Sequence, residues 1–335
     1  MGFFRDIFKT RSKDWYYGKL NDNQVPNEQP SAIIKPNEFY INIWLRSLRI
    51  VDVRKGLNSF YPVVHSFVSL PYLGKKEPVE FNMVTTPTKL QSLDAKRVDR
   101  VVTLNKRMLG PIPYRGGDLE LEVGLFSIKA ADLAGPYLNL MEDISTKAGV
   151  SFINQALQFA EPLKTGINLL TGGSDDTILE VGLSSTYSGN ILQSGYYTVI
   201  RAEKNKLYPQ DLRVDPNDYK LLYNGKKVED YPYIVFEITT SEQKADWWAI
   251  PRISETYNSL VKSIEEGKVS ETEENFMAFK RAVQISSELL PKDRTSIIAQ
   301  IQKDIIDPIS GATGVSIEAS KLKIKSLREI NIYQK

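Results

Sequence analysis

Leu119-Glu120-Leu121-Glu122-Val123-Gly124-Leu125 is the stretch of sequence that decides the fold class, because apolar and acidic residues alternate along most of it. An alternation of period two places successive side chains on opposite faces of a β-strand. We therefore expect the leucine and valine side chains to face a core and the two glutamates to face away from it. A Gly-Gly pair at residues 116–117 marks the turn that precedes the strand. The stretch thus predicts a half-buried β-strand.

Part of this stretch occurs a second time. The pattern L-E-V-G-L-x-S of residues 121–127 recurs at residues 179–185. We interpret the two copies as equivalent strands of one β-sandwich, in which each glycine leaves room for a bulge or a close backbone approach. Between them, residues 131–172 show apolar residues at helical spacing, and the Gly-Gly pair at 172–173 stops the last helix, which predicts a helical insertion.

Other β-rich runs separated by turn residues surround this pair. Asn224-Gly225 between β-forming residues is the strongest hairpin signal, because both turn positions need a positive φ. Several short strands punctuated in this way predict an antiparallel β-sandwich. The runs lie at residues 39–51, 61–70, 79–84, 100–104, 196–202, 219–223 and 232–238.

From Ser241 onward the apolar residues recur with the period of a helix. Ser270 with Glu273 predicts a capping box at the start of the second helix, and Asp293 is expected to start the third. Three helices with short polar links predict a small bundle or a helical flap. The expected apolar stripes are Ile253, Tyr257, Leu260, Val261 and Ile264; Phe276, Phe279, Val283 and Leu290; and Ile297, Ile298, Ile301 and Ile305.

These patterns together predict an α+β fold. Residues 37–240 form an antiparallel β-sandwich domain with the helical insertion at 131–172, and residues 241–306 form a C-terminal three-helix region. Residues 1–36 are expected to hold an amphipathic helix and an irregular arm. Residues 307–335 are expected to form a tail that adds an edge strand or stays mobile.

The succession of short strands, the paired LEVGL strands and the YIVFEI strand at residues 233–238 resembles C2-type β-sandwich domains over residues 37–240. C2 domains typically bind membranes or proteins, often through aspartate-lined calcium loops. The resemblance carries this role over to Asp211, Asp215 and Asp218. For the chain as a whole it implies a protein-binding or structural sandwich.

Composition excludes several classes of function. The 335 residues carry 43 basic and 41 acidic side chains, and this near balance argues against a dedicated nucleic-acid binder. The absence of cysteine removes disulfides, thiolate zinc sites, iron–sulfur clusters and a cysteine nucleophile. The single histidine, His65, lies in an apolar run, where a structural histidine is more common than a general base.

Catalytic motifs do not point to a reaction. The sequence contains neither the G-x-S-x-G nucleophile elbow nor a glycine-rich phosphate loop. S-x-x-K and K-T-G strings occur, but in the wrong order and context for a penicillin-binding enzyme. We therefore expect no catalytic residue, and the sequence identifies no small-molecule substrate. Oxygen ligands for calcium are the main metal candidate, and they are Asp211, Asp215 and Asp218.

Two groups of side chains are candidates for contact with a partner. An aromatic face beside basic residues near the N-terminus suits a membrane surface or a groove on a partner protein, and docking on its own domain is the alternative. Trp247 and Trp248 suit either packing inside the protein or an external interface. The N-terminal residues are Phe3, Phe4, Arg5, Ile7, Phe8 and Lys9.

The resulting hypothesis is a non-enzymatic binding or scaffold protein in a larger assembly, with a protein partner or a second copy of itself. The sequence has neither an apolar run of about 18 residues nor a secretory signal, so we expect a cytoplasmic location, with peripheral membrane contact through residues 1–13 as an alternative to protein contact. Two other functions stay open. One is a membrane-inserting effector that uses helices within residues 131–171, and the other is an enzyme that depends on carboxylates or a divalent metal.

Overall fold

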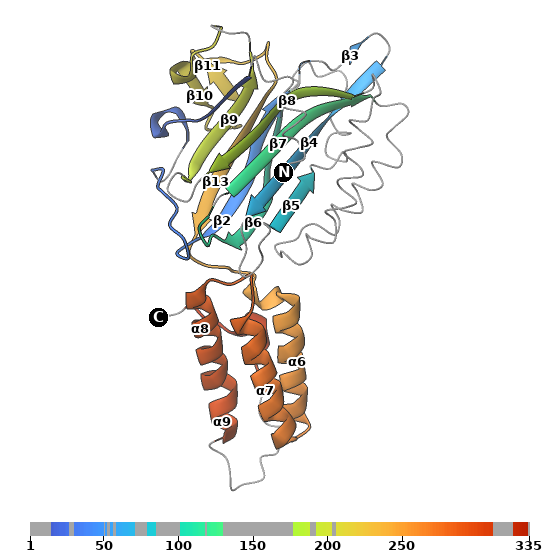
Figure 1. The fold of residues 1–335 in the computed structure, drawn as a ribbon, viewed down its shortest axis with the longest axis vertical. Coiled ribbons are helices and arrows are strands. Elements are labelled where there is room, and N and C mark those ends of the chain that lie inside the picture. Colours follow the sequence, from blue (N-terminus) through green and yellow to red (C-terminus); the bar gives the residue numbers. More distant parts are fainter. Residues whose placement is uncertain are drawn as a thin grey trace. The chain divides into compact units, whose positions relative to one another are not determined.

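The structure is a computed structural model in which the chain divides into two compact units (Figure 1). The first unit comprises residues 1–36 and 41–240, and the second comprises residues 37–40 and 241–335. The predicted α+β class is confirmed, since antiparallel sheets are followed by C-terminal helices. The residues that the structure describes are 15–26, 30–49, 51, 54–55, 58–70, 79–84, 101–117, 119–129, 177–187, 192–202, 206–310 and 324–333.

A five-stranded antiparallel sheet with the order β1-β9-β13-β2-β6 lies in the first unit. Its strands are β1 (Trp15–Lys19), β9 (Gly195–Arg201), β13 (Tyr233–Ser241), β2 (Tyr40–Arg49) and β6 (Val101–Pro113). Tyr197 of β9 pairs with Phe236 of β13, and their rings stack with centroids 5.2 Å apart. Residues of β2 on alternate positions, including Ile41, Ile43 and Leu45, are completely buried. The sheet is therefore a core element.

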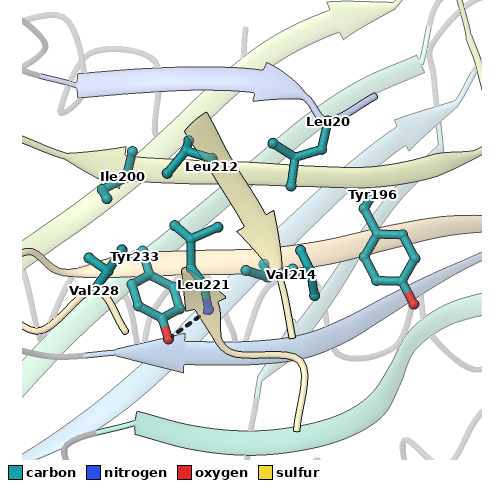
Figure 2. Close-up of a cluster of buried hydrophobic side chains, with 9 residues drawn as sticks. Leu20, Tyr196, Ile200, Leu212, Val214, Leu221, Val228 and Tyr233 are labelled. Atoms are coloured by element: carbon teal, nitrogen blue, oxygen red, sulfur yellow. Dashed lines mark hydrogen bonds between the residues drawn. The ribbon is translucent and has the colours of Figure 1, made fainter. Parts of the chain in front are cut away.

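A small sheet covers part of the other face of β9 and β13. Its strands are β10 (Leu212–Val214), β11 (Leu221–Tyr223) and β12 (Lys226–Lys227). Figure 2 shows the buried cluster that residues of β10 and β11, together with Val228, form with Leu20, Tyr196, Ile200 and Tyr233. The Tyr233 hydroxyl accepts a hydrogen bond from Leu221 N at 3.2 Å, and burial raises the pKa of Tyr233 to about 12.

The predicted hairpin at Asn224-Gly225 is confirmed. Asn224 and Gly225 have φ values of 50° and 76°, and they connect β11 to β12. Positive φ at both central positions is the requirement of the turn type that matches strand twist.

The repeated LEVGL strands are direct neighbours in a further antiparallel sheet. They lie in β7 (Leu119–Lys129) and β8 (Thr177–Tyr187), where Gly124 pairs with Gly182. The two copies are therefore antiparallel and centred on the Gly124–Gly182 pair, and the register shifts between Leu125 and Phe126. The other strands of this sheet are β3 (Arg54–Lys55), β4 (Asn58–Leu70) and β5 (Val79–Val84). The predicted helical insertion at 131–172 lies outside the described residues.

Helices follow in the second unit, as predicted. They are α6 (Pro251–Glu265), α7 (Val269–Gln284) and α8 (Pro291–Ile301), continued by a π-helical segment (Gln302–Ile306) and α9 (Asp307–Ser310). The short turns η5 (Trp247–Ala249) and η8 (Leu327–Glu329) flank them in sequence. Most of the expected apolar stripe residues are buried, whereas Val261 and Ile298 are half-buried. No helix in the described part of the chain is long and apolar enough to cross a bilayer.

Two predicted helix starts are wrong. Helix α7 begins at Val269, with Lys268 as its N-cap residue and without a side-chain cap, so Ser270 already lies in the first turn. Thr272 N donates to Lys268 O at 2.9 Å, so the first helical turn begins before Ser270, the residue expected to cap the helix. Helix α8 begins at Pro291, and Asp293 lies inside its first turn, where it is buried.

The prediction of an irregular arm before residue 37 is also wrong in part. Residues Trp15–Lys19 form the edge strand β1, in which Tyr17 pairs with Val199 of β9. The reason is that these aromatic residues favour a pleated surface, a signal that the polar residues around them obscured. The turn η2 (Asp22–Gln24) follows, and the buried Gln24 amide donates to Pro209 O and Leu212 O.

Candidate functional site

Arg46 lies between two aromatic rings on the five-stranded sheet. Its guanidinium carbon is 5.0 Å from the ring centroid of Trp44 and 5.2 Å from that of Tyr219. Trp44 and Arg46 are two residues apart in β2, so they share one face of the sheet, and Tyr219 comes from the connection between β10 and β11. A cation over an aromatic face is attracted by the ring quadrupole. Both rings therefore help to hold the guanidinium in place.

Glu237 of β13 holds the same guanidinium by its charge. Arg46 Nε donates to Glu237 Oε2 at 2.6 Å, Nη2 donates to the same oxygen, and Nη1 donates to Asn105 Oδ1. The side chains of Arg46 and Glu237 are only 13% and 12% exposed. Charge-assisted hydrogen bonds of this kind are stronger than neutral ones and fix geometry. Arg46 is thus held in a fixed orientation.

Tyr196 completes the group, which we name the arginine–aromatic cluster (Trp44, Arg46, Tyr196, Tyr219 and Glu237). Tyr196 is the cross-strand partner of Glu237, and its ring stacks on Tyr219 with centroids 6.4 Å apart. Burial raises the pKa of the Tyr196 hydroxyl, and the nearby Glu237 carboxylate raises it further. The hydroxyl therefore stays protonated and serves as a hydrogen-bond donor rather than as a base.

A hollow of about 340 Å³ lies beside this cluster. Pockets that hold small ligands typically measure about 300–1,000 Å³, so the hollow is at the small end of that range. Gly195 lines it with a φ of +125°, and a Cβ atom there would lie 2.7 Å from Ser31 Oγ. A larger residue at this position would strain the backbone and press on Ser31. The lining residues are Pro26, Pro30, Ser31, Arg46, Ser194, Gly195, Tyr196, Tyr219, Glu237, Ile238, Thr239 and Thr240.

The second unit contains a different polar group, a buried network around Asp293. The Tyr40 hydroxyl donates to Asp293 Oδ2, and the Tyr333 hydroxyl donates to the same oxygen at 3.2 Å. Leu290 N donates to the Tyr40 hydroxyl at 3.0 Å, and Lys244 N donates to the Tyr333 hydroxyl at 2.9 Å. Burial raises the pKa of Asp293, against the opposing effect of the two tyrosine hydrogen bonds. The network joins segments that are far apart in sequence, which is a structural role.

The tryptophan pair proposed for partner contact lies in the second unit. Trp247 is 3% exposed, so its ring is buried. Trp248 is half-buried and carries the guanidinium of Arg328 at 5.4 Å from its ring centroid. Both rings thus have packing roles inside the protein.

The three aspartates predicted for calcium take part in turns. Asp215 Oδ1 accepts from Asn217 N at 2.8 Å, and Asp218 forms an ion pair with Lys220 at 2.9 Å. In the ranges that the structure describes, no three side chains of histidine, cysteine, aspartate or glutamate gather as a metal site requires. Asp211 therefore does not join Asp215 and Asp218 in a common cluster of ligands.

The remaining predicted residues are placed only in part. The N-terminal group of Phe3, Phe4, Arg5, Ile7, Phe8 and Lys9 lies outside the described residues. The backbone of His65 lies in β4, where it pairs with Val84 of β5 and Gly124 of β7.

Sequence reasoning missed Arg46, Tyr219 and Glu237. A signal for two of them exists, because Arg46 and Glu237 are charged residues inside largely apolar strands. Opposite charges in two such strands indicate that the strands are neighbours and that the charges pair. No such signal marks Tyr219, which reaches Arg46 from a loop.

Similarity to known proteins does not add to this description. No protein-family model, no curated protein and no solved structure matches the chain.

Proposed function

We propose that the protein is a non-enzymatic binding protein that engages a partner protein through the arginine–aromatic cluster. The observation that supports this proposal is the fixed position of Arg46 between Trp44 and Tyr219. Tryptophan, tyrosine and arginine are the residue types in which interface binding energy concentrates. A side chain that is already ordered loses little conformational entropy on binding.

The chemistry of the cluster favours binding over catalysis. The Arg46 guanidinium and the Glu237 carboxylate already satisfy each other, and the raised pKa of Tyr196 keeps its hydroxyl protonated. A general base or nucleophile would need a group that can accept a proton near neutral pH. The residues of this cluster fit the role of a preformed contact surface instead.

The finer arrangement of the first unit is part of the same proposal. We propose that its sheets pack face to face as a C2-like β-sandwich. Complete burial of Phe236, on the face of β13 opposite the small sheet, supports such packing, because a buried face needs a cover.

The attachment role of residues 1–13 also stays a prediction. It is expected from the aromatic and basic residues of this segment. The cytoplasmic location, expected from the lack of a long apolar run and of a secretory signal, and membership of a larger assembly also stay predictions. Deletion of residues 1–13 should then abolish association with the partner or with liposomes and leave the melting temperature nearly unchanged. Unaltered association in pull-down and co-sedimentation assays would remove this role.

The test of the main proposal is affinity capture from host extract with the full chain. The variant Arg46→Ala/Glu237→Ala removes both charges, so it leaves no unpaired charge behind. We expect it to reduce recovery of the partner about tenfold or more, as loss of a central interface residue does. The matched control is Lys262→Ala/Glu266→Ala, which removes an exposed ion pair from the second unit.

Circular dichroism establishes that both variants are folded. Equal recovery of the partner with the cluster variant and the control variant would refute the proposal.

A further inference from the structure

The hollow beside the arginine–aromatic cluster is polar but carries no net charge. Arg46 and Glu237 are its charged lining residues, and they form an ion pair with each other. An anionic or cationic ligand would need an unpaired charge of opposite sign in the lining, because a desolvated charge is costly without one. The described lining offers none, so its chemistry favours a neutral ligand.

Hydroxyl groups dominate the rest of the lining. Ser31 Oγ donates to Asp22, and Ser194 Oγ bonds the backbone of Ala32, so these two are engaged. Thr239 Oγ1 accepts from Trp44 Nε1 at 3.2 Å and keeps its own proton to donate. Among the residues that the structure describes, the hydroxyls of Tyr219 and Thr240 have no hydrogen-bond partner.

The half-buried ring of Tyr219 gives the hollow an apolar surface next to these hydroxyls, whereas Tyr196 is only 3% exposed and supports it from behind. Tyr196 and Tyr219 stack on each other, and Tyr219 also covers Arg46. Tyrosine combines a broad apolar face with a polar group at its edge. A ligand that suits this lining needs hydroxyl groups for Thr239, Thr240 and Tyr219 and an aliphatic face for the Tyr219 ring.

We propose that the hollow binds a neutral sugar of one or two rings. A sugar ring presents several hydroxyls that both donate and accept, and its C–H face packs on aromatic rings. The volume of about 340 Å³ suits one or two rings rather than a long chain. The inference goes beyond the proposed function, because it names a small-molecule ligand and holds whether or not a protein binds at the cluster.

Saturation-transfer NMR on the full chain tests the inference. The probes are the methyl glycosides of glucose, galactose, mannose and N-acetylglucosamine, together with maltose and trehalose. We expect at least one of them to bind with a dissociation constant of about 1 mM. The variant Tyr219→Phe/Thr240→Val removes two hydroxyls and retains the aromatic ring, and it should weaken that binding about tenfold. Tyr208→Phe is the matched control, since Tyr208 is 50% exposed and does not line the hollow.

Three outcomes would overturn the inference. The first is that no sugar of the panel binds, and the second is that the double variant binds as the wild type does. The third is that no sugar binds, whereas inorganic phosphate or a proline-rich peptide does and the double variant weakens that binding. If partner capture depends on Arg46 and Glu237 but no sugar binds, the proposed function stands and the sugar inference fails. If a sugar binds but partner capture does not depend on these residues, the sugar inference stands and the proposed function fails.

Discussion

The arginine–aromatic cluster of the first unit and the Asp293 network of the second use similar side chains at different depths. In the first, Arg46 and Glu237 are slightly exposed, oppositely charged and bonded to each other. In the second, Asp293 is 2% exposed and accepts hydrogen bonds from the tyrosine hydroxyls of Tyr40 and Tyr333. The Glu237 carboxylate is paired with a guanidinium near the edge of solvent, whereas burial raises the pKa of the Asp293 carboxyl group, which has uncharged donors. Depth thus distinguishes a partly exposed ion pair from a buried network that joins distant segments of the chain.

The largest expected effect comes from removing the central tyrosine of the buried network. Tyr40→Ala should lower the free energy of unfolding of the second unit by about 3–5 kcal/mol, because it leaves a cavity and deprives Leu290 N of its acceptor. Hydrogen–deuterium exchange of peptides from α8 measures the change. Tyr208→Ala, at a half-exposed tyrosine, is the control and should change stability by less than about 0.5 kcal/mol. If α8 peptides show similar protection from hydrogen exchange in both variants, the expectation that the buried tyrosine contributes more to stability than the exposed one is wrong.

A smaller effect is expected in the arginine–aromatic cluster. Glu237→Gln should lower the free energy of unfolding of the first unit by about 1–3 kcal/mol, because Arg46 loses its charged acceptor in a poorly hydrated position. A double-mutant cycle with Arg46→Met isolates the interaction between the two side chains. A coupling energy indistinguishable from zero would show that the pair does not order the cluster.

The pH dependence of stability sharpens the comparison further. An unfolded aspartate titrates near its ordinary pKa of 3.8, and the pKa of Asp293 is raised above this value in the folded protein. The folded state therefore binds the proton more tightly, so this group's contribution favours folding at low pH and is lost as the pH rises from about 4 through the raised pKa. Asp293→Asn, whose amide oxygen still accepts from both tyrosines, should abolish this contribution.

Urea unfolding of wild type and variant across the acid-to-neutral range, followed on α8 peptides, measures that difference. Both proteins contain the neighbouring titratable groups Lys244, Asp246, Lys292 and Tyr333, so the contribution of these groups to the pH dependence cancels in the difference between the two profiles. An identical pH profile for both proteins would contradict the expectation.

The smallest effect is expected for ion pairs in full contact with solvent. Lys268 lies 2.9 Å from Glu266 and 3.2 Å from Glu271, and all three side chains are well exposed. Water and salt screen such pairs, and their formation costs side-chain entropy. Lys268→Ala should leave the unfolding midpoint unchanged within measurement error at low and at high salt. A clear drop at low salt alone would reveal an electrostatic contribution that exposure does not suggest.

Local patterns in the sequence predicted the elements but not the site. Alternation along residues 119–125 predicted β7, and Asn224-Gly225 predicted its hairpin, because both signals act within a few residues. Arg46 and Glu237 are 191 residues apart and meet only because β2 and β13 are neighbours in the sheet. Sheet order depends on long-range pairing, which a local pattern does not encode.

The same distinction explains the error at Asp293. An aspartate near the start of a helix is ordinarily an N-cap, which is a local preference. Here Tyr40, which is 253 residues away in sequence, donates to it, and this tertiary contact accounts for its buried place inside the first turn. The tertiary contact overrides the local preference.

The chain passes from one compact unit to the other at residues 36–37, 40–41 and 240–241, so the second unit consists of two separate segments of the chain. A fragment that begins at residue 241 would carry every α-helix that the structure describes but omit Tyr40, and Leu290 N and Asp293 would lose that hydroxyl. Transplantation of the helices into another protein would therefore require residues 37–40 as a grafted peptide or an added strand. A helical fragment cut at residue 241 alone would be less stable than the complete second unit.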